Sequence, residues 1–387
     1  MNHPMKTRVI PHARASIGEE EIDAVVGTLR SGWLTGGPMV LAFEQAVSAY
    51  LGGPQAVSTN SNTMGLLITL KALGIGPGDE VIIPTNTFVA TAMSAHHLGA
   101  TVVPVDIDPH TLSLAPDRVA AALTPRSRCL LPVHLGGLPC DMEPLHALAA
   151  RHGLRLVEDA AHALSASRGG EAVGAAHRSD ATVFSFYATK TITCGEGGMV
   201  TTQNADLAAR LRRLRHHGID RDAFNRQESR SWDYDVVEDG YKANMTDIAA
   251  AIGLAQLRKL PALQARRQAI AHRYREAFAP LPLHLPTAPP AGDSHAWHLF
   301  IIRLRPEAPL DRDGFMLAMQ RRGIQCGLHY IPLHRHSFWR QRLGLTPQAF
   351  PVAEEVFASS VTLPLYAAMS DDDVTYVIET VGDLLSC

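Results

Sequence analysis

The chain has 387 residues, of which 46% are hydrophobic and 19% charged, the balance of an ordinary globular protein rather than a disordered or fibrous one. This length leaves room for roughly two or three domains. The formal net charge of −3 gives no electrostatic footprint for a nucleic acid or an anionic membrane surface, so small molecules are the expected partners.

The sequence predicts no signal peptide, membrane helix or disulfide framework. Pro4 and Pro11 interrupt the first residues before an apolar run of signal-peptide length, and no stretch reaches the roughly 20 apolar residues of a membrane helix. The five cysteines are an odd number without CxxC spacing, which argues against a disulfide framework and a zinc site. We therefore expect a cytoplasmic protein.

Strands and helices alternate through the first two-thirds of the sequence. Alternating segments of this kind predict an α/β domain with a mostly parallel sheet, whose ligands lie at the carboxyl ends of the strands. The expected helices are 62–74, 87–99, 116–124 and 142–153, and the expected strands are 81–84, 101–108, 129–135, 154–160 and 181–187.

The pattern changes after about residue 245. A long helical stretch, 245–281, is expected to be kinked or broken near Pro261. A proline-rich connector then leads to an expected strand, 295–304, with one solvent-exposed face. Helices are expected near 312–323 and 371–385. We predict a large domain over 1–260 and a smaller α+β domain over 261–387.

Polar residues at the start of the first helix of the alternating region form a candidate anion site. The chain contains neither a G-x-G-x-x-G fingerprint nor a Walker lysine loop. Ser61, Asn62 and Thr63 instead stand where free backbone N–H groups and the helix dipole favour a phosphate. Ordinary capping of the helix by the same residue types is the alternative.

Two adjacent carboxylates, Glu158 and Asp159, end the expected strand 154–160. Because alternate residues of a strand face opposite ways, only one of them can point into a given site. That carboxylate could accept a hydrogen bond from a protonated ring nitrogen, or it could form a salt bridge or cap a helix.

Lys190 follows the apolar strand 181–187 and precedes glycines at 195, 197 and 198. It stands 31 residues after Asp159, far enough for a crossover to bring the two strand ends into one crevice. A desolvated lysine has a lowered pKa and can form a Schiff base with a carbonyl, and the glycines allow a tight bend around it. Phosphate, carboxylate and lysine sites together describe pyridoxal 5'-phosphate.

The histidines leave several interpretations open. His329, His334 and His336 lie close together in the sequence, but no carboxylate or cysteine in that segment completes a metal-ligand set, so a polar pocket wall or plain surface is expected. His134 and His329 could each contact a substrate or be structural. Cys194, four residues after Lys190, has no assigned role.

Together these motifs resemble the DegT/DnrJ-type sugar aminotransferases, fold-type I pyridoxal-phosphate enzymes that aminate keto sugars attached to nucleotides. The resemblance is nearly end to end, from "SGWLTGGPMVLAFEQA" to "RGIQCGLHYIPLH". The segments "VEDAAHA", "TITCGEGG" and "GYKANMTDI" are most similar to members that form UDP-4-amino-4-deoxy-L-arabinose and to relatives that act at carbon 4.

The resemblance implies a role for each residue of the cofactor site. Lys190 would form the Schiff base and later move the proton, and Asp159 would pair with the pyridine nitrogen. Phe88 would stack on the ring, although an aromatic residue beside a helix start usually belongs to the core. His162 would lie near the ring and its phenolic oxygen.

The phosphate would be held by Asn62 and Thr63 with Ser185, although "SNT" replaces the more usual Ser-Gly-Thr or Ser-Ala-Thr and makes a backbone-only role for Asn62 less certain. Asn244 would reach the phosphate of the neighbouring subunit, so the active unit would be a homodimer. The sugar side would be lined by Thr35, Tyr187 and His329.

The resemblance also implies the reaction, the transfer of an amino group from L-glutamate to the keto carbon, C4, of a nucleotide-linked keto sugar. Family members that dehydrate their substrate carry histidine at the lysine position, so Lys190 favours transamination. Two alternatives are a 3-keto sugar or keto cyclitol from an antibiotic pathway as acceptor, and a regulatory protein without turnover.

Overall fold

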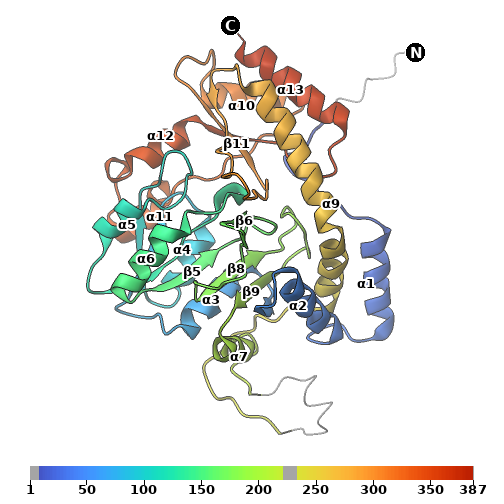
Figure 1. Ribbon diagram of the computed structural model, residues 1–387, viewed down its shortest axis with the longest axis vertical. Helices are drawn as coiled ribbons and strands as arrows, with labels where there is room; N and C mark the ends of the chain where they lie inside the picture. Colours follow the sequence, from blue (N-terminus) through green and yellow to red (C-terminus); the bar gives the residue numbers. More distant parts are fainter. Residues whose placement is uncertain (1–7, 221–232, 387) are drawn as a thin grey trace.

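The computed structural model describes residues 8–220 and 233–386, and a seven-stranded sheet forms the centre of its larger part (Figure 1). The strands follow one another across the sheet in the order β1 (Gln55–Thr59), β9 (Gly198–Thr202), β8 (Ala181–Ser185), β5 (Arg155–Asp159), β4 (Ser127–Leu130), β2 (Glu80–Pro84) and β3 (Thr101–Val105). Only β9 runs antiparallel to its neighbours, and the pairings from β8 to β3 are parallel. The prediction of a mostly parallel sheet is confirmed.

Helices cover both faces of this sheet. One face packs against α3 (Asn62–Ala72), α4 (Val89–His96) and α7 (Ala205–Leu214). The other face packs against α2 (Pro38–Tyr50), α5 (Pro116–Ala122), α6 (Met142–His152) and the first half of α9 (Asp247–Phe278), and α1 (Glu19–Ser31) lies outside α9. The strands are nearly all apolar because both of their faces are buried.

Strand periodicity decides which face of the sheet each carboxylate of β5 joins. Val157 belongs to the core beneath α3 and α4, whereas Leu156 belongs to the core beneath α6. Two residues further on, Asp159 therefore faces α3 and α4, and Glu158 faces α6.

A second, smaller core lies beyond the end of the large sheet. Its strands are β10 (Leu283–His284), β11 (Phe300–Leu304) and β12 (Ser360–Leu363), which pair antiparallel. They pack against the second half of α9, α10 (Arg312–Arg321) and α13 (Asp371–Leu385), all of which lie at one end of the molecule in Figure 1. The remaining elements are the hairpin β6 (Ser167–Arg168) and β7 (Glu171–Ala172), the helices α11 (Ser337–Leu343) and α12 (Pro351–Ser359), and the short turns η1 (Leu135–Gly137), η2 (Leu333–Arg335) and η3 (Pro347–Ala349).

The helix α9 is not broken at Pro261 and reaches from one core to the other, and the predicted domain division at 260/261 falls inside it. The strand expected over 295–304 begins only at Phe300. The small core covers one of its faces, and on the other Ile301 packs with Leu135 and Leu299 while Arg303 is half-buried. No helix in the described ranges is long and apolar enough to span a membrane.

Gly198 allows two segments of the site to approach each other closely. It is the first residue of β9, and a Cβ placed on it would lie 2.5 Å from the carbonyl carbon and oxygen of Ser61 and 2.6 Å from Oγ1 of Thr59. Real Cβ atoms do not come so close to backbone atoms. Glycine is therefore required here because a side chain would not fit, and not because of the backbone angles. It allows the start of α3 to pack directly against β9.

We expect Gly198→Ala to destabilise the protein by about 1–3 kcal/mol, because the added methyl group must displace the backbone at Ser61. Urea unfolding followed by circular dichroism measures the loss. Gly382→Ala in α13 is the matched control, since a Cβ there meets no atom within 4 Å, and it should be neutral or stabilising by about 0.5–1 kcal/mol. Equal losses in the two variants would contradict the steric argument.

Candidate active site

A cavity of about 480 Å³ opens where the carboxyl ends of β5 and β8 meet the starts of α3 and α4. Nine of the eleven residues predicted for the site line it: Asn62, Thr63, Phe88, Asp159, His162, Ser185, Tyr187, Lys190 and His329. Ligands of open α/β sheets bind at this edge, so the topology supports the sequence interpretation.

Lys190 lies in the loop between β8 and β9, held by a hydrogen bond from its backbone N–H to the carbonyl oxygen of Tyr187 at 3.0 Å. Burial lowers the pKa of its amine to about 8, and the carboxylate of Asp159 opposes that shift. An amine of this kind is partly neutral near physiological pH, which a nucleophile requires.

Asp159 is the buried carboxylate of the cavity. Thr91 donates a hydrogen bond to Oδ2 at 2.8 Å, and the Asn62 side chain and the backbone N–H of Ala161 donate to Oδ1 at 3.3 and 3.2 Å. Burial raises the pKa of Asp159, while these hydrogen bonds and Lys190 favour the ionised form. A carboxylate held in this way is a suitable partner for a protonated ring nitrogen.

The segment 61–63 at the start of α3 both caps the helix and leaves backbone N–H groups for an anion. Ser61 caps the helix, because its hydroxyl accepts a hydrogen bond from the N–H of Met64 at 3.2 Å. The N–H groups of Asn62 and Thr63 have no intrahelical acceptor, and Ser185 lines the same cavity. Since the Asn62 side chain donates to Asp159 and to the carbonyl oxygen of Val183, it is the backbone of Asn62 that remains for an anion.

His162 and Tyr330 form a hydrogen-bonded pair in the wall of the cavity. The Nδ1 atom of His162 accepts a hydrogen bond from the backbone N–H of Gly136 at 3.2 Å, so the proton of the neutral ring lies on Nε2, 3.0 Å from the hydroxyl of Tyr330. Burial and the nearby Lys190 hold the pKa of His162 well below its usual value. Phe88 lies 5.6 Å from Tyr330 between ring centroids and is 55% exposed, so it is not a core residue.

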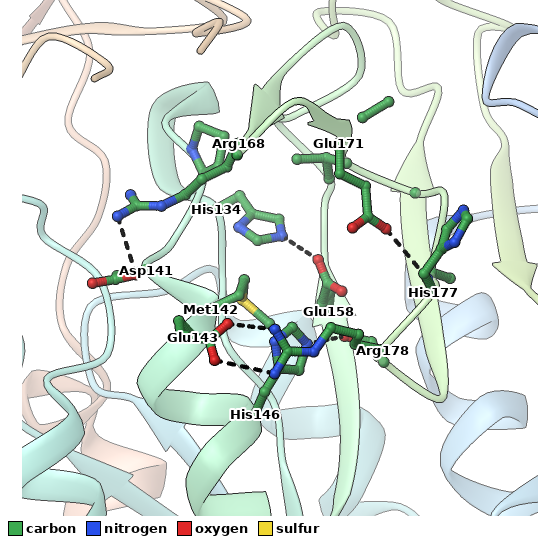
Figure 2. Close-up of a pocket in the computed structure, with 17 residues that line it drawn as sticks. His134, Asp141, Met142, Glu143, His146, Glu158, Arg168, Glu171, His177 and Arg178 are labelled. Carbon is green, nitrogen blue, oxygen red and sulfur yellow. Dashed lines mark hydrogen bonds and ion pairs between the residues drawn. The ribbon is translucent and has the colours of Figure 1, made fainter. Parts of the chain in front are cut away.

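Glu158 lines a second cavity of about 300 Å³, under α6 and beside the hairpin β6–β7, together with His134 and His146 (Figure 2). The Nε2 atom of His134 lies 2.8 Å from Oε2 of Glu158, and its Nδ1 accepts a hydrogen bond from the backbone N–H of Cys140. His134 is completely buried and absent from the wall of the first cavity. Both ring nitrogens of His134 are thus used in hydrogen bonds within the protein, and His134 is a structural residue.

The three histidines near residue 330 have separate partners. Nδ1 of His329 lies 2.9 Å from the hydroxyl of Thr362, and His329 also lines the site cavity. His334 bridges Thr85 and Glu354, while His336 contacts a backbone carbonyl oxygen. Within the described ranges, no group of three or more His, Cys, Asp or Glu side chains could hold a metal ion.

The other two predicted residues, Thr35 and Asn244, lie outside the cavity and contact each other. The Asn244 side chain donates a hydrogen bond to the Thr35 hydroxyl at 3.1 Å. Asn244 lines a small neighbouring pocket with Cys194 and Glu196, and Glu196 also lines the site cavity. Cys194 is buried, and its pKa is raised by burial, so it packs in the core as an inert thiol.

Several residues of the site were not predicted individually, among them Thr91, Tyr330 and His298. Thr91 could have been suspected, because it stands one helical turn after Thr87 at the start of α4, and the two hydroxyls are 2.8 Å apart. Tyr330 directly follows His329, so it belongs to a segment that was already expected on the sugar side. His298 stands more than 100 residues after Lys190, and no spacing in the sequence places it in the cavity.

The groups in the cavity fit pyridoxal 5'-phosphate. They include an amine with a lowered pKa for an aldehyde, a buried carboxylate for a ring nitrogen, and helix N–H groups with a serine hydroxyl for a phosphate. The cavity walls at Phe88 and His162 supply the aromatic surfaces for a flat ring.

Comparison with known proteins agrees with this chemistry. Residues 15–382 match the model of the DegT/DnrJ/EryC1/StrS aminotransferase family. The chain is 43% identical to the spore coat polysaccharide biosynthesis protein SpsC of Bacillus subtilis, over 98% of each chain.

Two solved structures are also similar to the chain. Spr1654 of Streptococcus pneumoniae, solved in a PLP form, is 34% identical, with a TM-score of 0.91 over 97% of this chain and 98% of that one. The sugar aminotransferase CalS13 of Micromonospora echinospora is 30% identical, with a TM-score of 0.87 over 97% of this chain and 100% of that one. The chain thus belongs to the DegT/DnrJ/EryC1/StrS aminotransferase family and is a pyridoxal-phosphate-dependent sugar aminotransferase.

Proposed function

We propose that this enzyme transfers the amino group of L-glutamate to C4 of a nucleotide-linked keto sugar, giving an amino sugar and 2-oxoglutarate. The observation that carries the transamination chemistry is the pairing of Lys190 with Asp159 in one cavity. The likeness of "VEDAAHA", "TITCGEGG" and "GYKANMTDI" to the enzyme that forms UDP-4-amino-4-deoxy-L-arabinose supports C4 and the nucleotide link. The relative SpsC, named for polysaccharide biosynthesis, is consistent with a sugar acceptor.

Pyridoxal 5'-phosphate, when bound, supplies an aldehyde for the amine and a ring that withdraws electrons from the reacting carbon. We propose that the amine of Lys190 would hold that aldehyde and would also take up and return a proton. The backbone N–H groups of Asn62 and Thr63, with the hydroxyl of Ser185, would hold the phosphate. Asp159 would accept a hydrogen bond from the protonated ring nitrogen, and the hydrogen bonds from Thr91 and Asn62 fix the direction of its carboxylate.

The lowered pKa of Lys190 suits both halves of the reaction. An amine with a pKa near 8 is neutral in about one molecule in ten at pH 7, against about one in three thousand for an ordinary lysine. The neutral amine is the base that takes a proton, and the ammonium is the acid that returns it. A pKa near the working pH serves both tasks, so one lysine suffices.

We further propose that the active unit is a homodimer in which Asn244 completes the phosphate site of the neighbouring subunit. Its side chain lies at the surface with Thr35, outside the cavity of its own chain. Glu196 lines both the cavity and the pocket of Asn244, so the two places adjoin. Thr35, Tyr187 and His329 are proposed to face the sugar.

We expect Lys190→Ala to lower turnover at least about 1,000-fold, because both the nucleophile and the proton carrier are lost. Formation of 2-oxoglutarate from L-glutamate in the presence of a nucleotide keto sugar measures this. Lys71→Ala is the control, since Lys71 pairs with Asp239 at the C-terminal end of α3, away from the cavity at its start, and the substitution should leave turnover unchanged. A Lys190→Ala protein with wild-type turnover would rule out the proposed mechanism.

The pKa of Lys190 can be tested without turnover. In the cofactor-free protein, acylation of Lys190 followed by mass spectrometry should have its midpoint at about pH 8, well below that of Lys71, whose pKa is raised by Asp239. Asp159→Asn should move the Lys190 midpoint lower still, because the carboxylate favours the ammonium form. A midpoint for Lys190 at or above that of Lys71 would show that the amine is not desolvated.

The position of amination requires a panel of acceptors. With L-glutamate as donor, we expect a nucleotide-linked 4-keto sugar to be aminated at least about tenfold faster than the matching 3-keto sugar or a keto cyclitol, as measured by mass spectrometry of the products. Preference for the 3-keto sugar or the cyclitol would overturn the C4 proposal and leave the aminotransferase chemistry intact.

A further inference from the structure

A strained turn lies between the large sheet and the small core and carries one residue into the active-site cavity. Trp297, just before β11, has a φ of 47°, in the left-handed region that a bulky residue rarely adopts. Such a conformation persists only where the surrounding structure enforces it, and it is commonly found at functional sites.

Three contacts enforce this conformation. The ring of His295 stacks on the indole of Trp297 with centroids 3.9 Å apart and planes 6° apart, and its Nδ1 accepts a hydrogen bond from the Trp297 N–H at 2.8 Å. The buried guanidinium of Arg267, in α9, donates to the carbonyl oxygens of Trp297 and Leu365 at 3.3 and 3.0 Å. The turn therefore depends on an arginine whose hydrogen bonds go to carbonyl groups instead of a carboxylate.

The same turn is joined to the loop beneath His162. Ala296 and Leu299 donate backbone hydrogen bonds to the carbonyl oxygens of Gly137 and Gly136 at 2.9 and 3.1 Å. A Cβ on Gly137 would lie 2.8 Å from the carbonyl oxygen of His162 and 2.9 Å from Cβ of Ala296, so glycine permits this approach. The position of residue 298 relative to His162 is thus fixed from both sides.

The residue that the turn presents is His298. Its side chain lines the active-site cavity, and its ring centroid is 4.5 Å from that of His162. His298 is 6% exposed, and its Nδ1 is buried without a hydrogen-bond partner among the described residues. No hydrogen bond within the described residues reaches Nε2 either, and Nε2, unlike Nδ1, is not sealed from solvent. Because a buried polar side chain without a partner costs free energy, Nε2 points to a ligand in the cavity that supplies the partner.

The charges around His298 favour an anionic ligand. Lys190 and Arg267 both act electrostatically on His298, and with burial and His162 they keep its ring neutral by holding its pKa well below the usual value. Among the described residues, Asp159 and Glu196 are the carboxylates that line the cavity, and Asp159 already accepts three hydrogen bonds. Arg267 has no carboxylate partner among the described residues, and its Nε is also without a hydrogen bond.

We propose that His298 binds the α-carboxylate of the amino-acid donor, donating its ring N–H to a carboxylate oxygen while Arg267 holds the turn and adds a favourable positive field. This proposal rests on the proposed function, in which an amino acid supplies the nitrogen. Every α-amino acid carries this carboxylate, whereas the keto sugar has none at the matching position. His298 is therefore a donor-binding residue, and Arg267 is a positioning residue.

The test separates the two half-reactions of the PLP-loaded enzyme. Loss of the cofactor absorbance band on mixing with L-glutamate gives the Kd and the limiting rate of the donor half-reaction. The reaction of the amine-loaded enzyme with a keto sugar gives those of the acceptor half-reaction. We expect His298→Ala to raise the donor Kd about 10- to 100-fold, the usual effect of losing a hydrogen bond to a charged group, and to change the acceptor Kd less than about threefold.

Two conservative variants distinguish a ligand contact from a structural role. In His298→Gln the side-chain amide nitrogen lies where Nε2 lies in histidine, so the donor Kd of this variant should be at least about tenfold lower than that of His298→Ala. His298→Asn places its amide at the sealed Nδ1 position and should restore less of the affinity. His272→Asn, on the exposed surface of α9, is the matched control and should leave every constant unchanged.

The measurements can separate a failure of the proposed role of His298 from a failure of L-glutamate as the donor. The same measurements are made with L-aspartate and L-alanine, and the role of His298 is judged with whichever amino acid the wild-type enzyme accepts. Rejection of L-glutamate by the wild-type enzyme would refute only the choice of donor. An unchanged donor Kd in a folded His298→Ala protein, a loss confined to the acceptor half-reaction, or equal recovery by asparagine and glutamine would overturn the inference.

Discussion

The buried carboxylate of Asp159 is the interaction on which the rest of the site depends. A carboxylate in a protein interior is costly unless it is hydrogen-bonded, and here the donors come from three different segments, at Asn62, Thr91 and Ala161. Each of these donors is fixed by the start of a helix or by the turn after β5. Satisfying one carboxylate thus positions α3 and α4 against the end of β5, and it leaves the cavity open beside Lys190.

The second constraint is that two pairs of backbone segments must pack very close together, which only glycine allows. Gly198 lets β9 rest against Ser61, and Gly137 lets the turn at Trp297 rest against His162. In both places a side chain of any size would separate two segments that each supply a wall of the site. Gly198, expected from the sequence to permit the bend after Lys190, is therefore needed for the contact between β9 and α3.

Segments that follow α9 also supply part of the cavity wall. His298, His329 and Tyr330 all belong to segments after α9, and they line the cavity together with Lys190. The helix α9 passes unbroken from one core to the other and packs in both. An aminotransferase needs this arrangement, since a proton must move between atoms held within hydrogen-bonding distance.

The sequence by itself determined the α/β class, the mostly parallel sheet, and nine residues of the cavity, including Lys190 and Asp159. The class and the sheet followed from hydrophobic periodicity, which is local, and the place of Lys190 and Asp159 from the fact that parallel strands bring their carboxyl ends to one edge. The resemblance to a known family implied residues such as Phe88, His162 and His329. Periodicity showed that Glu158 and Asp159 face opposite ways, but only the packing of α6 on one face and of α3 and α4 on the other decided which of them joins the site. The tertiary structure alone placed Thr91 and His298, and it alone showed the strained Trp297 and the continuity of α9 through Pro261. These features depend on contacts between residues far apart in the chain, which no local pattern records.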